Sequence, residues 1–539
     1  MPRMTGGDAI VDSLLRHGVD TVFGLPGAQM YGLFDSLARN ANRIRVINAR
    51  HEQTTAYMAL GYAQSTGRPA VFTVVPGPGV LNTLAALATA RGLNAPVLCV
   101  TGEAPSAMIG RGRGALHEIP DQLATLRSLL KFAERIEHPT TAPQVMARAI
   151  QAMISGRPGP VAVEIPWDQQ PAQADVDPVE PLEPLANPTP DSARIAALAK
   201  LIDEAQAPMI WVGGGAMNAG AEVLALAEKI GAPVVANRTG KGVVDARHPL
   251  SLSTLGAQPL WRETDLLIGI GTRLSVPLPG WGPAAEGLKV ARIDIDPAEP
   301  RRLAVDVPIV ADAADAARAL SAAVATKDGA TRRSAISDAK AFAAEAIAKA
   351  QPQQGFIEAI REALPEDGVL VDEMTQVAYI AWNGYQTYQP RTFITSGFSG
   401  TLGYGFPTAL GVKAANPDRA VVSIAGDGGF LYAGTELATA VHHGINLVTV
   451  VFDNASYGNV LRDQKRLYDG RHAGSLLTSP DFETYARAFG ARSWRAEDPD
   501  ELRSALPEAL AADAPALIVV PSDIDKDYPP YALPSPRRR

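Results

Sequence analysis

A carboxylate and an amide stand at the ends of two neighbouring strand patterns in the C-terminal third of the chain. One apolar run leads into Gly426-Asp427-Gly428, and a second ends shortly before Asn454. Mg²⁺ takes carboxylate and amide oxygens as ligands, and phosphate oxygens complete its coordination shell. The two glycines let the backbone approach a phosphate group closely. These residues allow a site where a divalent cation holds a diphosphate. Gly-Asp-Gly alone would favour a tight turn capped by the aspartate, so the choice depends on Asn454 and on further motifs along the chain.

A second carboxylate, Glu52, stands at the start of a predicted helix in the N-terminal third. It follows a strand pattern at 44–47 and precedes the helical run 54–63. A carboxylate in this position is often only a favourable partner for the positive end of a helix dipole. The dipeptide His51-Glu52 therefore indicates a function only together with the motifs around it.

Short apolar runs alternate with helical patterns along the whole chain, and this alternation predicts α/β domains with parallel sheets. A stretch rich in proline and acidic residues, 166–190, has no periodicity and is typical of a linker. A long alanine-rich helix is expected over 316–350, after which strand–helix alternation starts again. We therefore predict three consecutive α/β domains, at residues 1–170, 190–340 and 355–530.

Length and composition agree with this division and exclude several classes of protein. A chain of 539 residues is long enough for about three domains, and its net charge of −8 is spread along the sequence. No basic face indicates nucleic acid, since the one basic cluster, Arg537 to Arg539, is typical of a solvated tail. No apolar run is long enough to span a membrane, and the N-terminus lacks a signal-peptide core. Cys99 is the single cysteine, so we expect a cytoplasmic protein with that residue in its core.

Taken in order, the motifs resemble the acetolactate synthase-like branch of the thiamine-diphosphate (ThDP) superfamily, which also holds pyruvate oxidase and benzoylformate decarboxylase. The resemblance covers nearly the whole chain. It implies a pyrimidine-binding first domain, a Rossmann-like central domain and a diphosphate-binding third domain. The matching segments are Phe23 to Gly27, His51-Glu52-Gln53, Gly61-Tyr62-Ala63, Gly67-Arg68-Pro69, Gly77-Pro78-Gly79 with Asn82, Ser396 to Pro407, and Gly426-Asp427-Gly428 with Asn454.

The resemblance implies a role for each end of the cofactor. Glu52 would bond N1′ of the aminopyrimidine, and a proton shared there favours the imino form that takes the proton from C2 of the thiazolium ring. The carbonyl group of Gly400 would accept a bond from the 4′-amino group, and Leu402 would wedge the cofactor into its bent shape. Asp427, Asn454 and the backbone carbonyl of Ser456 would hold Mg²⁺.

The same resemblance implies further cofactor contacts and an assembly. The additional cofactor-binding residues are Gly27, Pro78, Asn82, Thr375, Gln376, Gly426, Gly428, Ser456 and Tyr457. In the family the counterparts of Glu52 and Asp427 meet across a subunit interface. A homodimer is therefore the minimum assembly expected, and a homotetramer is common in such enzymes. Glu436, after the glycine turn, is expected to be structural.

FAD in the central domain is possible but not favoured. The glycines Gly213 to Gly215 follow a strand pattern, but they do not form the dinucleotide-binding glycine fingerprint. Gly271-Thr272-Arg273 stands where flavin-binding relatives have a contacting segment. The residues after it, Leu274 to Val276, depart from the family pattern.

The reactive end of the site leaves alternatives open. His117 could relay a proton at neutral pH, or it could be an ordinary loop histidine. Asp463 stands where acetolactate synthases carry a tryptophan that helps to select the second ketoacid. The resemblance favours ThDP- and Mg²⁺-dependent decarboxylation of a 2-oxo acid with carboligation. The alternatives are a non-oxidative decarboxylase or aldehyde lyase of the benzoylformate decarboxylase type, and a catalytically silent ThDP-binding subunit.

Overall fold

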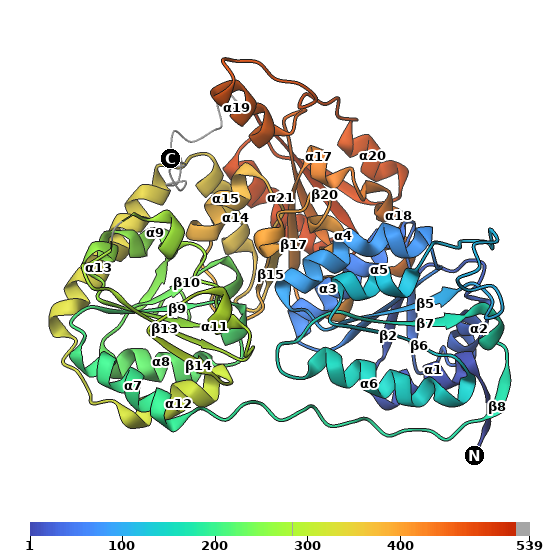
Figure 1. The fold of residues 1–539 in the computed structure, drawn as a ribbon. Coiled ribbons are helices and arrows are strands. Elements are labelled where there is room, and N and C mark those ends of the chain that lie inside the picture. Colours follow the sequence, from blue (N-terminus) through green and yellow to red (C-terminus); the bar gives the residue numbers. More distant parts are fainter. Residues whose placement is uncertain (283, 524–539) are drawn as a thin grey trace.

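Three bodies, each a six-stranded sheet covered by helices, make up the molecule (Figure 1). The computed structural model describes residues 1–282 and 284–523. Within that part of the chain, every pair of strands in the three large sheets is parallel. Parallel neighbours need a crossover between them, and the alternating strand and helix patterns supply it. The predicted fold class is confirmed.

The first sheet carries the segment that leads to Glu52. Its strands lie in the order β3 (Arg45–Asn48), β2 (Thr21–Gly24), β4 (Ala70–Val74), β5 (Val97–Glu103), β7 (Val161–Pro166) and β6 (Phe132–Arg135). The helices of this body are α1 (Gly6–Arg16), α2 (Tyr31–Arg39), α3 (Glu52–Thr66), α4 (Pro78–Leu93), α5 (Gln122–Leu129) and α6 (Ala142–Ile154). Cys99 is fully buried in β5, as expected.

The central sheet has the doubly wound order of a Rossmann-like domain. Its strands are β11 (Ser251–Ser253), β10 (Val234–Ala236), β9 (Pro208–Val212), β12 (Leu266–Ile270), β13 (Lys289–Asp294) and β14 (Val307–Val310). Its helices are α7 (Ser192–Glu204), α8 (Gly220–Ile230), α9 (Thr254–Ala257), α10 (Pro277–Gly280), α11 (Glu299–Arg302), α12 (Ala313–Ala323) and α13 (Ala330–Ala348).

The third sheet repeats the topology of the first. Its strands are β16 (Phe393–Ile394), β15 (Val369–Val371), β17 (Val421–Gly426), β18 (Val448–Asp453), β20 (Ala516–Pro521) and β19 (Arg492–Arg495). Counted along the chain within each sheet, the spatial order in both is second, first, third, fourth, sixth and fifth strand. The helices are α14 (Gln353–Ala363), α15 (Gln376–Gly384), α16 (Gly405–Ala415), α17 (Asp427–Phe430), α18 (Leu437–His443), α19 (Gly458–Leu467), α20 (Phe482–Ala488) and α21 (Pro499–Ala511).

Helices α3 and α16 join the first and third bodies. A Cβ atom on Gly61 would lie 2.0 Å from the Thr408 carbonyl oxygen, and one on Gly411 would lie 1.9 Å from that of Met58. Only glycine allows the two backbones to come this close. Residues of both bodies share one apolar core around this contact. The start of α3, where Glu52 lies, is therefore held in a defined place relative to the third body.

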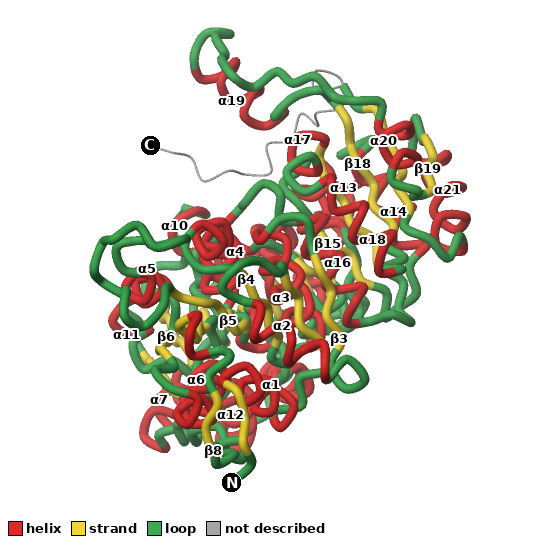
Figure 2. The backbone as a smooth tube through the Cα atoms, turned by 90° about the vertical axis from the view of Figure 1, so that its right-hand side faces the viewer, coloured by secondary structure: helices red, strands yellow, loops and turns green. Residues whose placement is uncertain are grey.

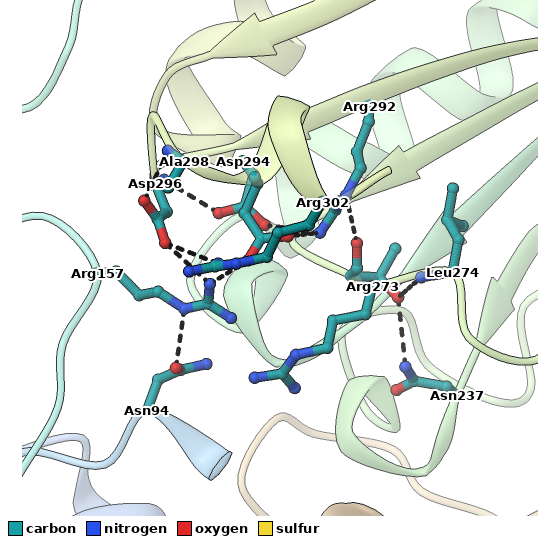
Figure 3. A network of polar contacts seen from close by, with 12 residues as sticks. Asn94, Arg157, Asn237, Arg273, Leu274, Arg292, Asp294, Asp296, Ala298 and Arg302 are labelled. Atoms are coloured by element: carbon teal, nitrogen blue, oxygen red, sulfur yellow. Dashed lines mark hydrogen bonds and ion pairs between the residues drawn. The ribbon is translucent and has the colours of Figure 1, made fainter. Parts of the chain in front are cut away.

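An ionic network joins the first and central bodies (Figure 3). Arg157, in the loop after α6, bonds Asn94 at 2.9 Å and Asp296 at 3.1 Å, and it also pairs with Glu299. Glu299 is 2% exposed and is further bonded by Arg292 and Arg302. A buried carboxylate needs such partners, because an unpaired buried charge is costly. The network fixes the carboxyl end of β13 against the first body.

Two local expectations need correction. The long helix expected over 316–350 is two helices, α12 and α13, because the segment with Asp328 and Gly329 interrupts the pattern. The stretch predicted as a linker contains β8 (Gln173–Asp175), which pairs with β1 (Arg3–Thr5) in an antiparallel sheet. The chain then crosses to α7 as an extended segment without regular secondary structure, seen along the base of Figure 1. The arginine cluster at the C-terminus lies outside the described residues.

Helix α19 lies at the outer end of the third body, away from the first and central sheets (Figure 2).

Among the described residues, no helix is both long enough and apolar enough to cross a membrane.

Candidate cofactor site

A cavity of about 360 Å³ lies at the carboxyl ends of the strands of the third sheet. This edge is where open α/β sheets bind ligands, and the volume falls in the range of small-molecule sites. All residues predicted for the third domain line it: Thr375, Gln376, Gly400, Leu402, Gly426, Asp427, Gly428, Asn454, Ser456 and Tyr457.

Asp427 begins α17 directly after β17, and its side chain is 2% exposed. Burial and the nearby Asp453 raise the pKa of Asp427 to about 6. The hydroxyl of Ser479 lies 3.1 Å from Asp427 and 2.7 Å from Asp453. One hydroxyl has a single hydrogen to donate, so it serves one carboxylate at a time. Two carboxylates that share one donor fit the place of a bound cation.

The amide of Asn454 is oriented by the turn after β18. Its Oδ1 atom accepts bonds from the backbone N–H of Ser456 at 3.1 Å and from the Ser456 hydroxyl at 2.9 Å. Among the described residues, no three His, Cys, Asp or Glu side chains converge on a metal site. The set Asp427, Asn454 and Ser456 would therefore hold Mg²⁺ together with oxygens of a diphosphate, which fits the donors present.

Two loops form the walls of the cavity. Thr375 caps α15 by accepting from Ala378 N–H at 3.1 Å, and Gln376 donates to Asn459 at 2.6 Å. Gly400 has a φ of 56°, in the left-handed region that glycine adopts without strain. The turn at Gly400 directs the loop so that Leu402 lines the cavity.

Glu373 is a buried carboxylate that the sequence analysis did not assign to the site. It is 2% exposed and lines the cavity, and its Oε1 accepts from the Gly403 N–H at 2.5 Å. The backbone N–H groups of Tyr404 and Gly405 also interact with the carboxyl group, although Oε2 makes no hydrogen bond of good geometry among the described residues. Added Cβ atoms on Gly405 and Gly429 would both lie within 3 Å of Glu373. The available signal was the acidic pair Asp372-Glu373 after the buried strand β15, just as Asp427 follows β17.

We expect the stability of the ligand-free protein to depend on pH through Glu373. Burial raises the pKa of its carboxyl to about 7. Since this folded-state pKa lies above the unfolded value, the native state loses stability as pH rises through the window between the two. Glu373→Gln should shrink the change in unfolding free energy between pH 5 and pH 8 by about 1–3 kcal/mol. Denaturant titrations at the two pH values measure it, and equal changes in the variant and the wild type would contradict it.

The predicted first-domain residues gather at the corresponding edge of the first sheet. Asn82 Nδ2 donates to Glu52 Oε2 at 3.0 Å. A Cβ atom on Gly27 would lie 2.6 Å from Val75, so the loops after β2 and β4 are in contact there. Pro78 is the first residue of α4. None of these residues, Glu52 included, lines the cavity of the third body of the same chain.

His117 lies in the loop that follows β5. Its φ is 62°, an uncommon value for histidine, and its Nδ1 is buried without a partner among the described residues. A Cβ atom on Gly77 would lie 2.1 Å from the His117 carbonyl oxygen, and Gln29 donates to Leu116 O at 2.7 Å. These contacts hold the histidine at the same sheet edge as Glu52. Its role as a proton relay stays a prediction.

The glycines of the central domain have a packing explanation. A Cβ atom on Gly215 would lie 2.8 Å from the Gly271 Cα, and one on Gly213 would lie 2.5 Å from the Gly271 oxygen. Both glycines therefore let the loops after β9 and β12 touch. Arg273 lies over the Phe398 ring at 4.9 Å and donates to Gly92 O at 3.1 Å. That FAD is possible but not favoured at this sheet edge stays a prediction.

Comparison with family models matches each of the three bodies. The thiamine pyrophosphate enzyme N-terminal TPP binding domain matches residues 4–125, the central domain matches 195–320, and the C-terminal TPP binding domain matches 373–520. The chain is a ThDP-dependent enzyme of the acetolactate synthase-like family. The resemblance seen in the motifs is thus confirmed.

Relatives of this ThDP enzyme align along nearly its whole length. It is 34% identical to a probable acetolactate synthase large subunit of Methanocaldococcus jannaschii, over 98% of this chain and 93% of that protein. It is 31% identical to the acetolactate synthase isozyme 1 large subunit of Escherichia coli, over 99% and 96%. It is also 34% identical to a probable 2-ketoarginine decarboxylase of Pseudomonas aeruginosa, over 96% and 93%.

Proposed function

We propose that this enzyme decarboxylates a 2-oxo acid with ThDP and Mg²⁺ and then joins the product to a second carbonyl compound. ThDP supplies the electron sink for breaking the bond between the carboxylate and the carbonyl carbon. The observation that carries the proposal is the pair of half-sites, Glu52 with Asn82 at one sheet edge and Asp427 with Asn454 at the other. The first half-site suits the aminopyrimidine and the second suits the metal–diphosphate.

Within this proposal the residues of the chain have separate tasks. Asp427, Asn454 and Ser456 bind and orient the charged end of the cofactor. Leu402 and Gly400 line the cavity wall and would exclude water from the reacting end of the cofactor. Glu52 holds a proton at N1′, and its position beside Asn82 directs the carboxyl group. A proton held in an environment of low dielectric is shared more strongly than in water.

We also propose a homodimer or homotetramer in which each cofactor lies between two copies of the chain. Glu52 is absent from the cavity lined by Asp427 of the same chain, which agrees with half-sites contributed by different copies. Large apolar side chains are exposed beside both half-sites, and burial between copies would remove them from water. They are Leu81 at 45%, Phe398 at 64%, Leu431 at 40% and Tyr432 at 56% exposed.

A second candidate is decarboxylation without carboligation. Asp463 takes the place of the family's tryptophan on α19, and it pairs with Arg462 at 3.2 Å and Arg466 at 3.6 Å. A charged, ion-paired group offers no apolar surface to a second ketoacid. The similarity to a probable 2-ketoarginine decarboxylase favours the same alternative.

Product analysis from pyruvate alone, followed by a panel of 2-oxo acids, tests the two candidates. With ThDP and Mg²⁺ added, we expect acetolactate or acetoin from a carboligase and acetaldehyde alone from a decarboxylase. Omission of ThDP and the Glu52→Gln variant are the controls: the first should abolish product, and the second should lower its rate by about 100-fold or more. No turnover with any 2-oxo acid would contradict both candidates and favour a catalytically silent subunit.

A further inference from the structure

Glu436 connects the third body to the segment that carries Glu52. It ends the short turn between α17 and α18, and its side chain is 0% exposed. Both of its carboxylate oxygens lie 3.0 Å from the backbone N–H of Arg50, and Oε1 also accepts from the His51 N–H at 3.0 Å. The hydroxyl of Thr439 donates to Oε2. The acceptor atoms of Glu436 are thus directed at the two residues before Glu52.

The other end of α18 holds the same segment. His443 Nε2 lies 2.8 Å from Asn48 Oδ1 and 3.2 Å from the Asn48 backbone nitrogen, and the Arg45 side chain donates to the His443 carbonyl oxygen at 3.2 Å. Burial lowers the pKa of His443 to about 4, so the ring is neutral at neutral pH. The two ends of helix α18 therefore both contact the segment that runs from β3 to the start of α3.

Burial of the Glu436 carboxylate costs desolvation free energy, so its contacts must offset this cost. Burying a charge without an opposite charge costs several kcal/mol unless hydrogen bonds replace its hydration. Glu436 receives that compensation from main-chain N–H groups at the positive end of α3. An anchor on two successive N–H groups defines where the helix begins and in which direction its first side chain leaves the backbone.

We propose that Glu436 is a positioning residue for Glu52, which rests on the proposed function of Glu52 in the ThDP site. The described contacts of the Glu52 carboxylate consist of one hydrogen bond, from Asn82. Its placement therefore depends on the backbone before it. A misplacement of about 1 Å at a reacting group can cost about 100-fold in rate. The segment from Asp427 through α17 to Glu436 therefore connects the metal-ligand half-site to the Glu52 half-site of the same chain.

Glu436→Gln tests the proposal with two kinds of exchange. In the cofactor-free protein, the amides of Arg50 and His51 should exchange with deuterium about tenfold faster, because the amide side chain offers one acceptor atom instead of two. In the loaded enzyme, C2–H exchange of bound ThDP should slow by about tenfold or more. Retention of ThDP and Mg²⁺ should stay within about twofold, since the Asp427 cavity is unchanged.

A double variant separates positioning from general damage. If Glu436 acts through Glu52, adding Glu436→Gln to Glu52→Gln should slow C2 exchange no further than Glu52→Gln alone. Thr439→Val is the matched control, because it removes the hydroxyl donor and leaves both backbone contacts. The proposal is overturned if the double variant slows C2 exchange by the product of the two single losses. It is also overturned if Glu436→Gln shows the same amide exchange and the same C2 exchange as the wild type.

Two further measurements keep the outcome clear. If Glu436→Gln does not fold, Glu436→Asp can replace it. This variant retains the charge but shortens the side chain by one methylene. It should also speed amide exchange and slow C2 exchange, each by less. If the wild-type protein neither binds ThDP nor turns over a 2-oxo acid, the proposed function fails. The amide exchange of Arg50 and His51 in the cofactor-free protein still decides whether Glu436 holds the segment.

Discussion

Glu52→Gln is expected to slow C2–H exchange of bound ThDP by about 100- to 10,000-fold, with cofactor retention unchanged within about twofold. Glutamine keeps the volume of the side chain and can still accept from Asn82, whose amide donates to Glu52 at 3.0 Å. It cannot hold a proton that a ring nitrogen takes up and returns. The loss therefore falls on proton transfer, while the diphosphate half-site in the third body is untouched.

The measurement is deuterium incorporation at C2 of bound ThDP, read by NMR after acid quench. Glu134→Gln is a matched control, because it also removes one carboxylate of the first body, at an ion pair with Arg148 far along the chain from α3. Wild-type exchange in Glu52→Gln would remove Glu52 from the proton-holding role. Equal slowing in Glu134→Gln would show a general effect of lost charge.

Asp427→Asn is expected to make the cofactor-free protein more stable above pH 6 and to weaken ThDP–Mg²⁺ retention by about 100-fold. Burial and Asp453 raise the pKa of Asp427 to about 6. Because the folded-state pKa lies above the ordinary value, the ionised carboxylate lowers stability as pH rises through that window. Asparagine removes the buried charge, but it also removes the anionic ligand that a hard cation requires.

Thermal melts at pH 5 and pH 8, with and without ThDP and Mg²⁺, measure both effects in one series. The wild type should gain a large increase in Tm from ThDP with Mg²⁺, and Asp427→Asn should gain little. Asp418→Asn is the control, since that aspartate is exposed in the same body. Equal stabilisation of Asp427→Asn by the cofactor would refute the ligand assignment.

Much of the fold could be predicted because apolar runs and breaks are local features. The apolar runs at 266–270 and 369–371 are strands β12 and β15. The prediction of one helix over 316–350 was wrong for a related reason. Alanine favours helix on both sides of the break between α12 and α13, and the break itself depends on packing. The strand order shared by the first and third sheets was beyond prediction, because it depends on pairing between distant strands.

Some residues of the site could likewise be predicted from the sequence, and others could not. The family resemblance of the motifs pointed to cavity residues from Thr375 to Tyr457, and parallel strands bring the carboxyl ends of β15, β17 and β18 to one edge. Glu373 and Glu436 needed the tertiary structure. A buried carboxylate takes its role from the donors around it, and two of the three donors to Glu436, the N–H groups of Arg50 and His51, lie almost four hundred residues away. Hydrogen-bond geometry between such distant segments is set only when the bodies pack together, through contacts such as the one between α3 and α16.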